Sequence, residues 1–384
     1  MTRIRADWIE RPATRAVTDC LTRAGFQAYF VGGCVRNALI GAPVSDIDIA
    51  TDALPEQVQH CATGAGLRQV PTGIEHGTIT VVSDGIPHEI TTFRRDIETD
   101  GRHATVAFST DLRDDAARRD FTMNALYAAP DGTVVDPLNG IPDLTARRVR
   151  FIGDPNARIA EDYLRILRFF RFHAWYGDMA QGVDPNGLAA CAENLEGLEH
   201  LAKERVTTEL VKLLSAPDPA PSVASMRACG VLNTLLPGAD DRALAPLIHL
   251  ETTVDAPPNP MRRLAVSGGV EPENHLRLSR AQMKELTDLR EMIASAEGPA
   301  ALGYRYGVDA ARDGILARSA MLETVLSPDT MDQIATGAAA IFPVTAQDLM
   351  PDFAGAGLGQ RLKSLKSDWI ASGFRLTRDE LLKR

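Results

Sequence analysis

The chain has 384 residues, of which 45% are hydrophobic and 24% are charged, and its formal net charge is -10 at pH 7. This composition is ordinary for a globular protein, and the length favours two to four domains over one core. No apolar run approaches the ~20 residues of a membrane span, and the N-terminal stretch lacks an apolar core of signal-peptide length.

The first part of the chain predicts a small α/β unit. Apolar residues at helical spacing, with Gly25 as a stop, predict a helix over residues 7–25, and a strand over residues 27–31 follows it. Pro55 predicts the start of a helix over residues 56–65. Strand-like runs then occupy residues 67–71, 78–82 and 88–93. Strands with flanking helices are typical of a mixed α/β domain.

The stretch VGGCVRNALIGAPVSDIDIATD, residues 31–52, combines two signals. Gly32 and Gly33 precede a helix and would let backbone N–H groups approach an anion. Asp46 and Asp48 alternate along a strand and would point to one side, where an oxygen-rich pair suits Mg²⁺. A tight turn and a solvated strand end are the alternatives for each half alone. Together the two halves predict a nucleoside triphosphate held with its metal.

Two further features follow in the same unit. Glu89 would add a third carboxylate beside Asp46 and Asp48, although an exposed strand residue is an equally good interpretation. Residues 95–103 are polar, contain glycine and lack periodicity, which predicts a mobile loop.

The block RRDFTMNALY, residues 118–127, mixes cations with side chains that can bind a ribose or a base edge. Arg119 would bind phosphate, whereas Asp120 and Asn124 could hydrogen-bond a sugar or base. The alternative is the exposed, salt-bridged start of a helix.

A predicted helix across residues 159–174 places Glu161, Arg165 and Arg168 on the face opposite its apolar stripe, with Asp162 beside them. Such a face is normally only solvated and ion-paired. Asp162 and Arg165 nevertheless match one chemical template. A carboxylate accepts from the exocyclic amino group of cytosine or adenine, while a guanidinium donates to the adjacent ring nitrogen. Uracil and guanine present the reverse pattern, and each mispaired buried group costs ~1–3 kcal/mol.

The remainder predicts helices. One runs over residues 203–214, a proline-rich break at residues 216–221 suggests a hinge, and a basic helix is expected around residues 362–369 after glycine-rich residues 355–359. The stretch 358–384 holds seven Lys/Arg against three Asp/Glu, and a second basic tract contains arginines 147, 148, 150, 158, 165, 168 and 171. An acidic chain with such tracts can bind a folded RNA.

The motifs, in this order, resemble the class II tRNA nucleotidyltransferases (CCA-adding enzymes), relatives of bacterial poly(A) polymerase. The resemblance covers residues 28–212 and runs through GGCVRNALIG-DID, PTGIEHGTITVV, HEITTFR, RRDFTMNAL, DPLNGIPDL, EDYLRILRFFRF and KERVTTEL. It implies an α/β, palm-like nucleotidyltransferase head with a small mixed sheet, followed by an all-α neck, body and tail. The implied boundaries are residues 1–145, 146–215, 216–341 and 342–384, with base selection in the neck and tRNA contact in the basic tail.

The resemblance also implies roles for named residues. Asp46 and Asp48 would ligate Mg²⁺, and Gly32, Gly33 and Arg36 would hold the triphosphate. Arg119, Asp120 and Asn124 would contact sugar or phosphate, and the base-selecting motif falls on Glu161, Asp162 and Arg165. Residues 95–103 match the family's flexible loop, which is needed for the switch from C to A. One position departs: Asn37 follows Arg36 where the family usually has aspartate.

The expected activity is template-independent addition of C, C and A to the tRNA 3′ end from CTP and ATP, with Mg²⁺ as the cofactor. The alternatives are a poly(A) polymerase that adds only A, and an RNA-binding relative without catalysis. None of the eight histidines is followed by aspartate, which argues against an appended phosphohydrolase. Five scattered cysteines without a C-x-x-C pair predict reduced thiols, a cytoplasmic location and no zinc site. No membrane and no protein partner are implied.

Overall fold

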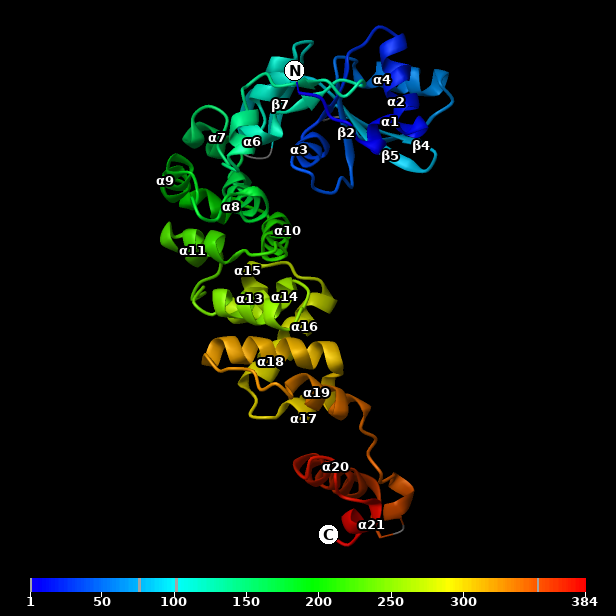
Figure 1. The fold of residues 1–384 in the computed structure, drawn as a ribbon, viewed down its shortest axis with the longest axis vertical. Helices are drawn as coiled ribbons and strands as arrows, with labels where there is room; N and C mark the ends of the chain where they lie inside the picture. Colours follow the sequence, from blue (N-terminus) through cyan, green and yellow to red (C-terminus); the bar gives the residue numbers. More distant parts are fainter. Residues whose placement is uncertain (1, 75–76, 101–102, 351) are drawn as a thin grey trace. The chain divides into compact units, whose positions relative to one another are not determined.

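In a computed structural model the chain forms two compact units, Met1–Leu235 and Leu236–Arg384. The structure describes residues 2–74, 77–100, 103–350 and 352–384. The first unit holds the sheet and the predicted site, and the second is helical (Figure 1). This is the predicted fold class of an α/β head followed by helices, while the finer division into four parts stays a prediction.

A seven-stranded mixed sheet forms the core of the first unit, in the order β3-β4-β5-β2-β1-β8-β9. The pairing of β2 with β5 is parallel and places Asp48 opposite Glu89, whereas the other pairs of this sheet are antiparallel. The strands are β1 (Ala28–Val31), β2 (Ile47–Thr51), β3 (Arg68–Gly73), β4 (Thr78–Ser83), β5 (Ile86–Thr92), β8 (Tyr127–Ala128) and β9 (Val134–Val135). The strands predicted over residues 27–31, 67–71, 78–82 and 88–93 are therefore confirmed, with shifts at their ends.

Helices α1 (Asp7–Glu10), α2 (Pro12–Arg23) and α4 (Pro55–Gly64) lie together beside the sheet, and α2 and α4 pack on it (Figure 1). Leu21 and Val58 of these helices are buried, as are Ile49 and Ile90 of the sheet, and both α2 and α4 contact β5. The single helix predicted over residues 7–25 is wrong in one respect, because it breaks at Arg11. Pro12 lacks an N–H and disfavours a helical conformation in the residue before it, and Arg11 has φ -56° and ψ 133°.

The other face of the sheet carries the predicted site. Val31 and Ala50 on this face pack with Phe93, Ala125 and Tyr127 in a buried cluster. Because side chains alternate along a strand, Asp48 lies on the same face as Ala50. The short elements around this face are α3 (Gly33–Leu39), α5 (Leu112–Ala117), the 3-10 turn η2 (Thr122–Asn124) and α6 (Ile141–Thr145).

The segment predicted as an irregular loop, residues 95–103, is largely a two-stranded antiparallel sheet. Strand β6 (Arg94–Asp100) pairs with β7 (His103–Phe108), with a register shift between Asp96 and Glu98. Backbone pairing across the hairpin overrides the lack of a side-chain pattern from which the loop was predicted. Residues 101 and 102 of the predicted loop lie outside the described residues, as do residues 75 and 76 of the motif PTGIEHGTITVV.

Helices complete the first unit. The helix predicted across residues 159–174 is in fact two, α7 (Pro155–Glu161) and α8 (Leu164–Tyr176), because Asp162 is extended with φ -157° and ψ 104°. Aromatic contacts join α8 to the preceding segments. The centre of the Phe121 ring lies 5.0 Å from the ring centres of both Phe151 and Phe172, and Phe172 is on α8. The remaining helices are α9 (Pro185–Glu193), η3 (Leu195–His200), α10 (Lys203–Leu214), α11 (Ala220–Ala228) and α12 (Val231–Leu235).

The second unit is all helical in its described part. Its helices are α13 (Leu244–Thr253), α14 (Pro260–Ser267), α15 (Pro272–His275), α16 (Arg280–Ala294), α17 (Pro299–Tyr306), α18 (Val308–Leu322), α19 (Thr330–Ala339), η4 (Ala346–Leu349), α20 (Gly355–Ala371) and α21 (Arg378–Leu382). The basic helix predicted near residues 362–369 is the C-terminal half of α20, whose first turn includes the glycines. None of the helices in the described ranges combines the length and apolarity of a membrane span.

Candidate active site

Two carboxylates mark the site at the N-terminal end of β2. Asp46 is exposed and lies one residue before the strand, where Ser45 Oγ donates to its Oδ2 at 2.8 Å. Asp48 is half-buried within β2, opposite the exposed Glu89 of β5. The structure therefore brings the predicted metal pair and the predicted third carboxylate to one edge of the head.

The pKa of Asp48 is shifted by burial and by the charges of its neighbours Glu89, Arg119 and Asp46. Burial raises it, Glu89 and then Asp46 raise it further, and Arg119 opposes them, with a result of about 6. The site thus carries more negative charge than its protein cation neutralises, which is the condition in which a bound cation is stabilising.

The carboxylates of this site provide only oxygen donors for a metal ion. Among the described residues, no three His, Cys, Asp or Glu side chains form a group able to hold a metal ion. Mg²⁺ is usually held by one or two carboxylates together with substrate phosphates and waters, and it takes oxygen donors. Asp46 and Asp48 fit that pattern, and Glu89 is a charged neighbour.

The paired glycines lie where the chain passes from β1 into α3. Gly32 has φ +70°, and a Cβ on it would lie 3.5 Å from Arg119 Nη1 and 3.8 Å from the Asn124 carbonyl oxygen. The Gly32 N–H donates to the Leu126 carbonyl oxygen at 3.2 Å. The backbone donors of a phosphate cradle therefore begin at Gly33, in the first turn of α3, where N–H groups have no intrahelical acceptor.

Gly32→Ala should destabilise the fold by about 1–3 kcal/mol, because alanine is strained at this φ, while its methyl group would lie at ordinary contact distance from Arg119. Chemical denaturation of the pure protein measures the loss. Gly41→Ala is the control: Gly41 also has φ +72°, but its Cβ would meet nothing within 4 Å. We expect a similar loss in the two variants, because the positive φ is the cause that they share, and an unchanged stability of Gly32→Ala would contradict the strain at Gly32.

Arg119 is the cation of the site, and a buried carboxylate holds it. Its Nη2 lies 2.9 Å from Asp115 Oδ2, and its Nε donates to Tyr127 Oη at 3.1 Å. Tyr127 Oη donates in turn to Asp115 at 2.7 Å. Asp115 is 1% exposed; burial raises its pKa, but Arg119 and Arg118 outweigh burial and lower it to about 2. Asp115 and Tyr127 were not among the predicted site residues, since only the fold brings α5 against β8.

Arg36, predicted to hold a triphosphate, lies beneath the cradle. It is 5% exposed, its Nη1 donates to Asn124 Oδ1 at 2.5 Å, and its Nη2 donates to Tyr176 Oη at 2.8 Å. Its guanidinium carbon lies 3.8 Å from the centre of the Tyr176 ring. In this structure Arg36 braces Asn124 and α8, and a direct contact with a triphosphate stays a prediction.

Asn37, the departure from the family pattern, has a structural explanation. Its Oδ1 accepts from Arg36 Nε at 3.1 Å and from Nη2 at 2.9 Å, as an aspartate could. Its Nδ2 also donates to the Pro43 carbonyl oxygen at 2.7 Å, which an ionised aspartate could not do. Asn37 therefore supports Arg36 and also ties α3 to the loop that leads to Asp46.

Asp120 and Asn124 continue a polar chain from the head into α8. Asn124 Nδ2 donates to Asp120 Oδ1 at 2.9 Å, and Arg168 Nε donates to Asp120 Oδ2 at 2.8 Å. Burial raises the pKa of Asp120, but the charge of Arg168 and the hydrogen bonds from Asn124, Arg168 and the Phe121 N–H together lower it to about 2. Asp120 and Asn124 are both buried, so in this structure they support the site from inside the protein.

The predicted base-selecting residues lie around the break between α7 and α8. The Arg165 N–H donates to the Asp162 carbonyl oxygen at 2.9 Å, which sets the two residues one turn apart. The Arg165 side chain donates to Glu161, to the Arg158 carbonyl oxygen at 2.8 Å and to the Arg118 carbonyl oxygen at 3.2 Å. Glu161 thus supports Arg165 and Arg158, and the Arg118 contact links Arg165 to the segment that carries Arg119.

Asp162 has a partner that the sequence did not indicate. Its Oδ2 lies 2.7 Å from Nη2 of Arg205, in the first turn of α10. The two residues are 43 positions apart. Arg205 belongs to the motif KERVTTEL, but the sequence of this motif does not indicate which carboxylate pairs with Arg205.

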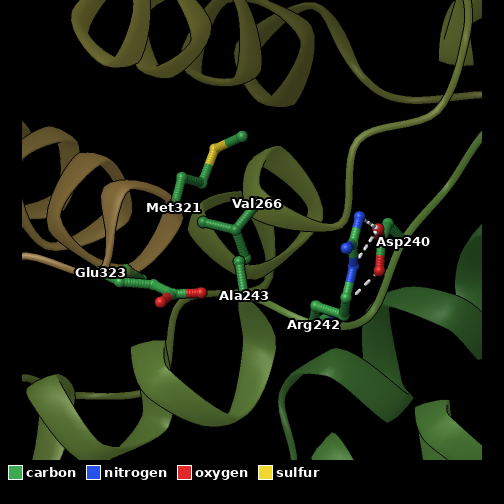
Figure 2. Close-up of a pocket in the computed structure, with 7 residues that line it drawn as sticks. Asp240, Arg242, Ala243, Val266, Met321 and Glu323 are labelled. Atoms are coloured by element: carbon green, nitrogen blue, oxygen red, sulfur yellow. Dashed lines mark hydrogen bonds and ion pairs between the residues drawn. The ribbon is translucent and has the colours of Figure 1, made fainter.

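A separate hollow of about 260 Å³ in the second unit carries none of these residues. In Figure 2, Arg242 is turned toward Asp240 on one side of the hollow, and Glu323 lies on the other side. Ala243, Val266 and Met321 lie between the two sides. Arg242 is paired with Asp240 at 2.5 Å, so the lining offers no grouped catalytic residues within the described part of the unit.

Comparison with known families gives two matches, of which the second extends a few residues beyond Leu235, where the first unit ends. Residues 28–150 match the Poly A polymerase head domain, and residues 182–242 match the probable RNA and SrmB-binding site of polymerase A. The mitochondrial CCA tRNA nucleotidyltransferase 1 of Mus musculus is 32% identical over 397 residues, covering 96% of this chain and 88% of that protein. The CCA-adding enzyme of Levilactobacillus brevis is 40% identical over 219 residues, covering 56% of this chain and 53% of that protein.

Solved structures agree in fold over nearly the whole chain. The Bacillus stearothermophilus CCA-adding enzyme in complex with CTP superposes with a TM-score of 0.71 and 25% identity, covering 94% of each chain. The Thermotoga maritima CCA-adding enzyme complexed with tRNA has a TM-score of 0.71 and 20% identity, covering 100% of this chain and 98% of that one. The second likeness concerns the fold alone.

Proposed function

The chain belongs to the family of CCA tRNA nucleotidyltransferases, and from this premise we propose that it adds C, C and A to the 3′ end of tRNA, using CTP and ATP without a template. One observation carries the proposal. A single compact unit holds Asp46 and Asp48 near the paired glycines, and it also holds Asp162 and Arg165. The Arg165 side chain donates to the Arg118 carbonyl oxygen, which links this second pair to the segment that carries Arg119. The first pair suits phosphoryl chemistry and the second suits selection of a base.

The reaction joins the tRNA 3′-oxygen to the α-phosphorus of the nucleotide, while the bond to the pyrophosphate oxygen breaks. In this proposal Arg119, fixed by Asp115 and Tyr127, meets phosphate oxygens beside Gly32, and its Nη1 lies 3.5 Å from where a Cβ on Gly32 would be. The N–H groups of Gly33 and the first turn of α3 add donors for the triphosphate. Positioning and charge neutralisation supply most of the catalysis in such a transfer.

Nucleotidyltransferases of this family use divalent metal ions. We propose that the ion is Mg²⁺, since Asp46 and Asp48 present only oxygen donors. When bound, Mg²⁺ would neutralise charge on the triphosphate and activate the attacking hydroxyl. All five cysteines are free, which supports a reducing compartment such as the cytoplasm.

In this proposal Asp162 and Arg165 read the base. Asp162 accepts from the amino group of cytosine or adenine, and Arg165 donates to the neighbouring ring nitrogen. Three acceptors take three of the five N–H groups of Arg165, which leaves two for the base among the contacts of the described residues. We propose that Glu161 and Arg168 support this reading as ion-pair partners, and that the basic residues of 342–384 contact the tRNA.

A single incorporation assay tests the function. The pure protein is given tRNAs that end at the discriminator, at C or at CC, with one labelled nucleotide at a time and MgCl2. The expected result is CMP on the first two substrates and AMP on the third. Repeated AMP addition to every substrate would indicate a poly(A) polymerase, and no pyrophosphate release with any tRNA would indicate an RNA-binding relative.

Arg165→Ala should erode the rejection of UTP and GTP by roughly 10- to 100-fold, because the variant no longer leaves an unpaired buried donor against the wrong base. The measurement is the ratio of kcat/KM for CTP to that for UTP on tRNA that lacks its terminal CCA. Arg113→Ala, an exposed arginine on α5, is the control. An unchanged ratio in Arg165→Ala would remove Arg165 from base selection.

A further inference from the structure

Asp162 is held from two sides at the point where α7 and α8 break. Oδ1 accepts from the Leu164 N–H at 3.1 Å, and Oδ2 accepts from Arg205 Nη2 at 2.7 Å. Its backbone is extended, so the packing of a helical turn does not set the direction of the side chain. The side chain is 26% exposed, and these two partners therefore fix the carboxylate.

Arg205 comes from a firmly anchored helix. Val206 and Leu210 of α10 are buried, and α10 packs along α8. One turn after Arg205, Glu209 lies 2.6 Å from Arg171 Nε and 4.0 Å from Arg168 Nη1, both on α8. Ion pairs at successive turns of α10 thus hold both Asp162 and α8.

We infer that Arg205 is a specificity-determining residue of the proposed reaction, acting by positioning the Asp162 carboxylate that reads the base. This inference rests on the proposed function. Arg205 touches no reacting atom, and its effect passes through Asp162 alone.

The chemistry of a carboxylate makes this role compatible with base reading. An ionised carboxylate offers only acceptors, with about four lone-pair sites. Leu164 and Arg205 occupy two of these sites, which leaves acceptors for the amino group of cytosine or adenine. A carboxylate free to rotate would lose that hydrogen bond, and it would also cease to confront the carbonyl oxygen of uracil or guanine. The preference for cytosine and adenine over uracil and guanine therefore falls for two reasons: the correct base is held less well, and the wrong base is repelled less.

The opposite role is that Arg205 blocks Asp162 and must be displaced by the base. The two roles differ in sign. A positioning residue, when removed, raises KM for CTP and ATP and lowers the preference over UTP and GTP. A blocking residue, when removed, lowers KM for CTP and ATP.

The test compares Arg205→Met, Arg205→Lys and the wild type. Methionine keeps an apolar stem but has no N–H donor, whereas lysine keeps the charge without the planar fork. Lys203→Met is the matched control, since Lys203 is an exposed cation in the same turn of α10. For each protein the ratio of kcat/KM for CTP to UTP is measured on tRNA lacking CCA, and for ATP to GTP on tRNA ending in CC. Affinity for tRNA cancels in these ratios.

Arg205→Met should lower both ratios by roughly 10- to 100-fold, Arg205→Lys should lower them less, and Lys203→Met should leave them unchanged. Thermal unfolding of each variant is recorded, and a general loss of fold would lower activity with all four nucleotides without changing the ratios. Wild-type ratios in an active Arg205→Met, or a lower KM for CTP, would overturn the role of Arg205. A wild-type chain that incorporates neither CMP nor AMP would instead overturn the proposed function.

Discussion

Asp48→Ala is expected to lower CMP and AMP incorporation by about 10³-fold or more, since loss of a metal ligand removes several kcal/mol of transition-state stabilisation. Asp46→Ala should have a similar effect, because these two aspartates are the proposed ligands. Single-nucleotide incorporation on tRNAs ending at the discriminator and at CC measures both losses.

The charge balance of the site gives this prediction a second readout. Burial, Glu89 and Asp46 all disfavour the ionised form of Asp48, so its removal should relieve repulsion in the metal-free protein. We therefore expect Asp48→Ala to keep or raise Tm without metal and to lose the rise in Tm that MgCl2 with CTP gives the wild type.

Asp19→Ala controls for the loss of a surface aspartate. Asp19 pairs with Arg23 on the exposed side of α2, and such pairs contribute about 0–1 kcal/mol. This variant should keep full activity and the metal-dependent rise in Tm. Substantial incorporation by either Asp48→Ala or Asp46→Ala would contradict the assignment of the metal pair.

Local patterns predicted the elements that carry the chemistry. The glycine turn, the strand that ends in Val31, and Asp48 in β2 with Asp46 just before it follow from short-range signals, namely small residues, β-branched residues and alternation. Helix α10 was predicted from Lys203 to Leu214, the bounds the structure gives it. Such features depend on neighbours in the sequence, so a single chain suffices to predict them.

The partners of these residues depend on contacts between distant segments. Arg205 meets Asp162, Asp115 fixes Arg119 beside Gly32, and Tyr176 covers Arg36 from 140 residues away. The helix break at Asp162 was missed for the same reason. The periodicity of the apolar stripe continues across the break, while the hydrogen bond from the Leu164 N–H to Asp162 Oδ1 and the ion pair with Arg205 favour an extended residue there.

These contacts also change how the candidate residues divide their work. Asp46, Asp48 and Arg119 would face the triphosphate in the proposed function, whereas Arg36, Asn124 and Asp120 form a polar chain that ends on Arg168 of α8. The chain runs from the helix after the glycine cradle to the helix that carries Arg165. The polar chain therefore links the helix after the paired glycines to the helix that carries the proposed base-reading residue Arg165.

At low pH the stability of the wild type against unfolding should depend on the ionisation of Asp120 in this polar chain. The folded pKa of Asp120 lies below its ordinary value of about 4, so its contribution to stability is present above that value and is lost as pH falls through about 2. Acid unfolding of the wild type between these limits should be steeper than that of a variant in which Asp120 no longer titrates.

Asp120→Asn is expected to lower the free energy of unfolding of the first unit by about 3–5 kcal/mol, because it leaves Arg168 partly buried with only a distant Glu209 as its carboxylate partner. Denaturant titration at pH 7 measures the loss, with Asp19→Asn as the exposed-pair control, for which about 0–1 kcal/mol is expected. The double variant Asp120→Asn, Arg168→Met should recover part of the stability, since it removes the unpaired charge as well. If Asp120→Asn costs no more than Asp19→Asn, the polar chain from Arg36 to Arg168 does not stabilise the junction between the head and α8.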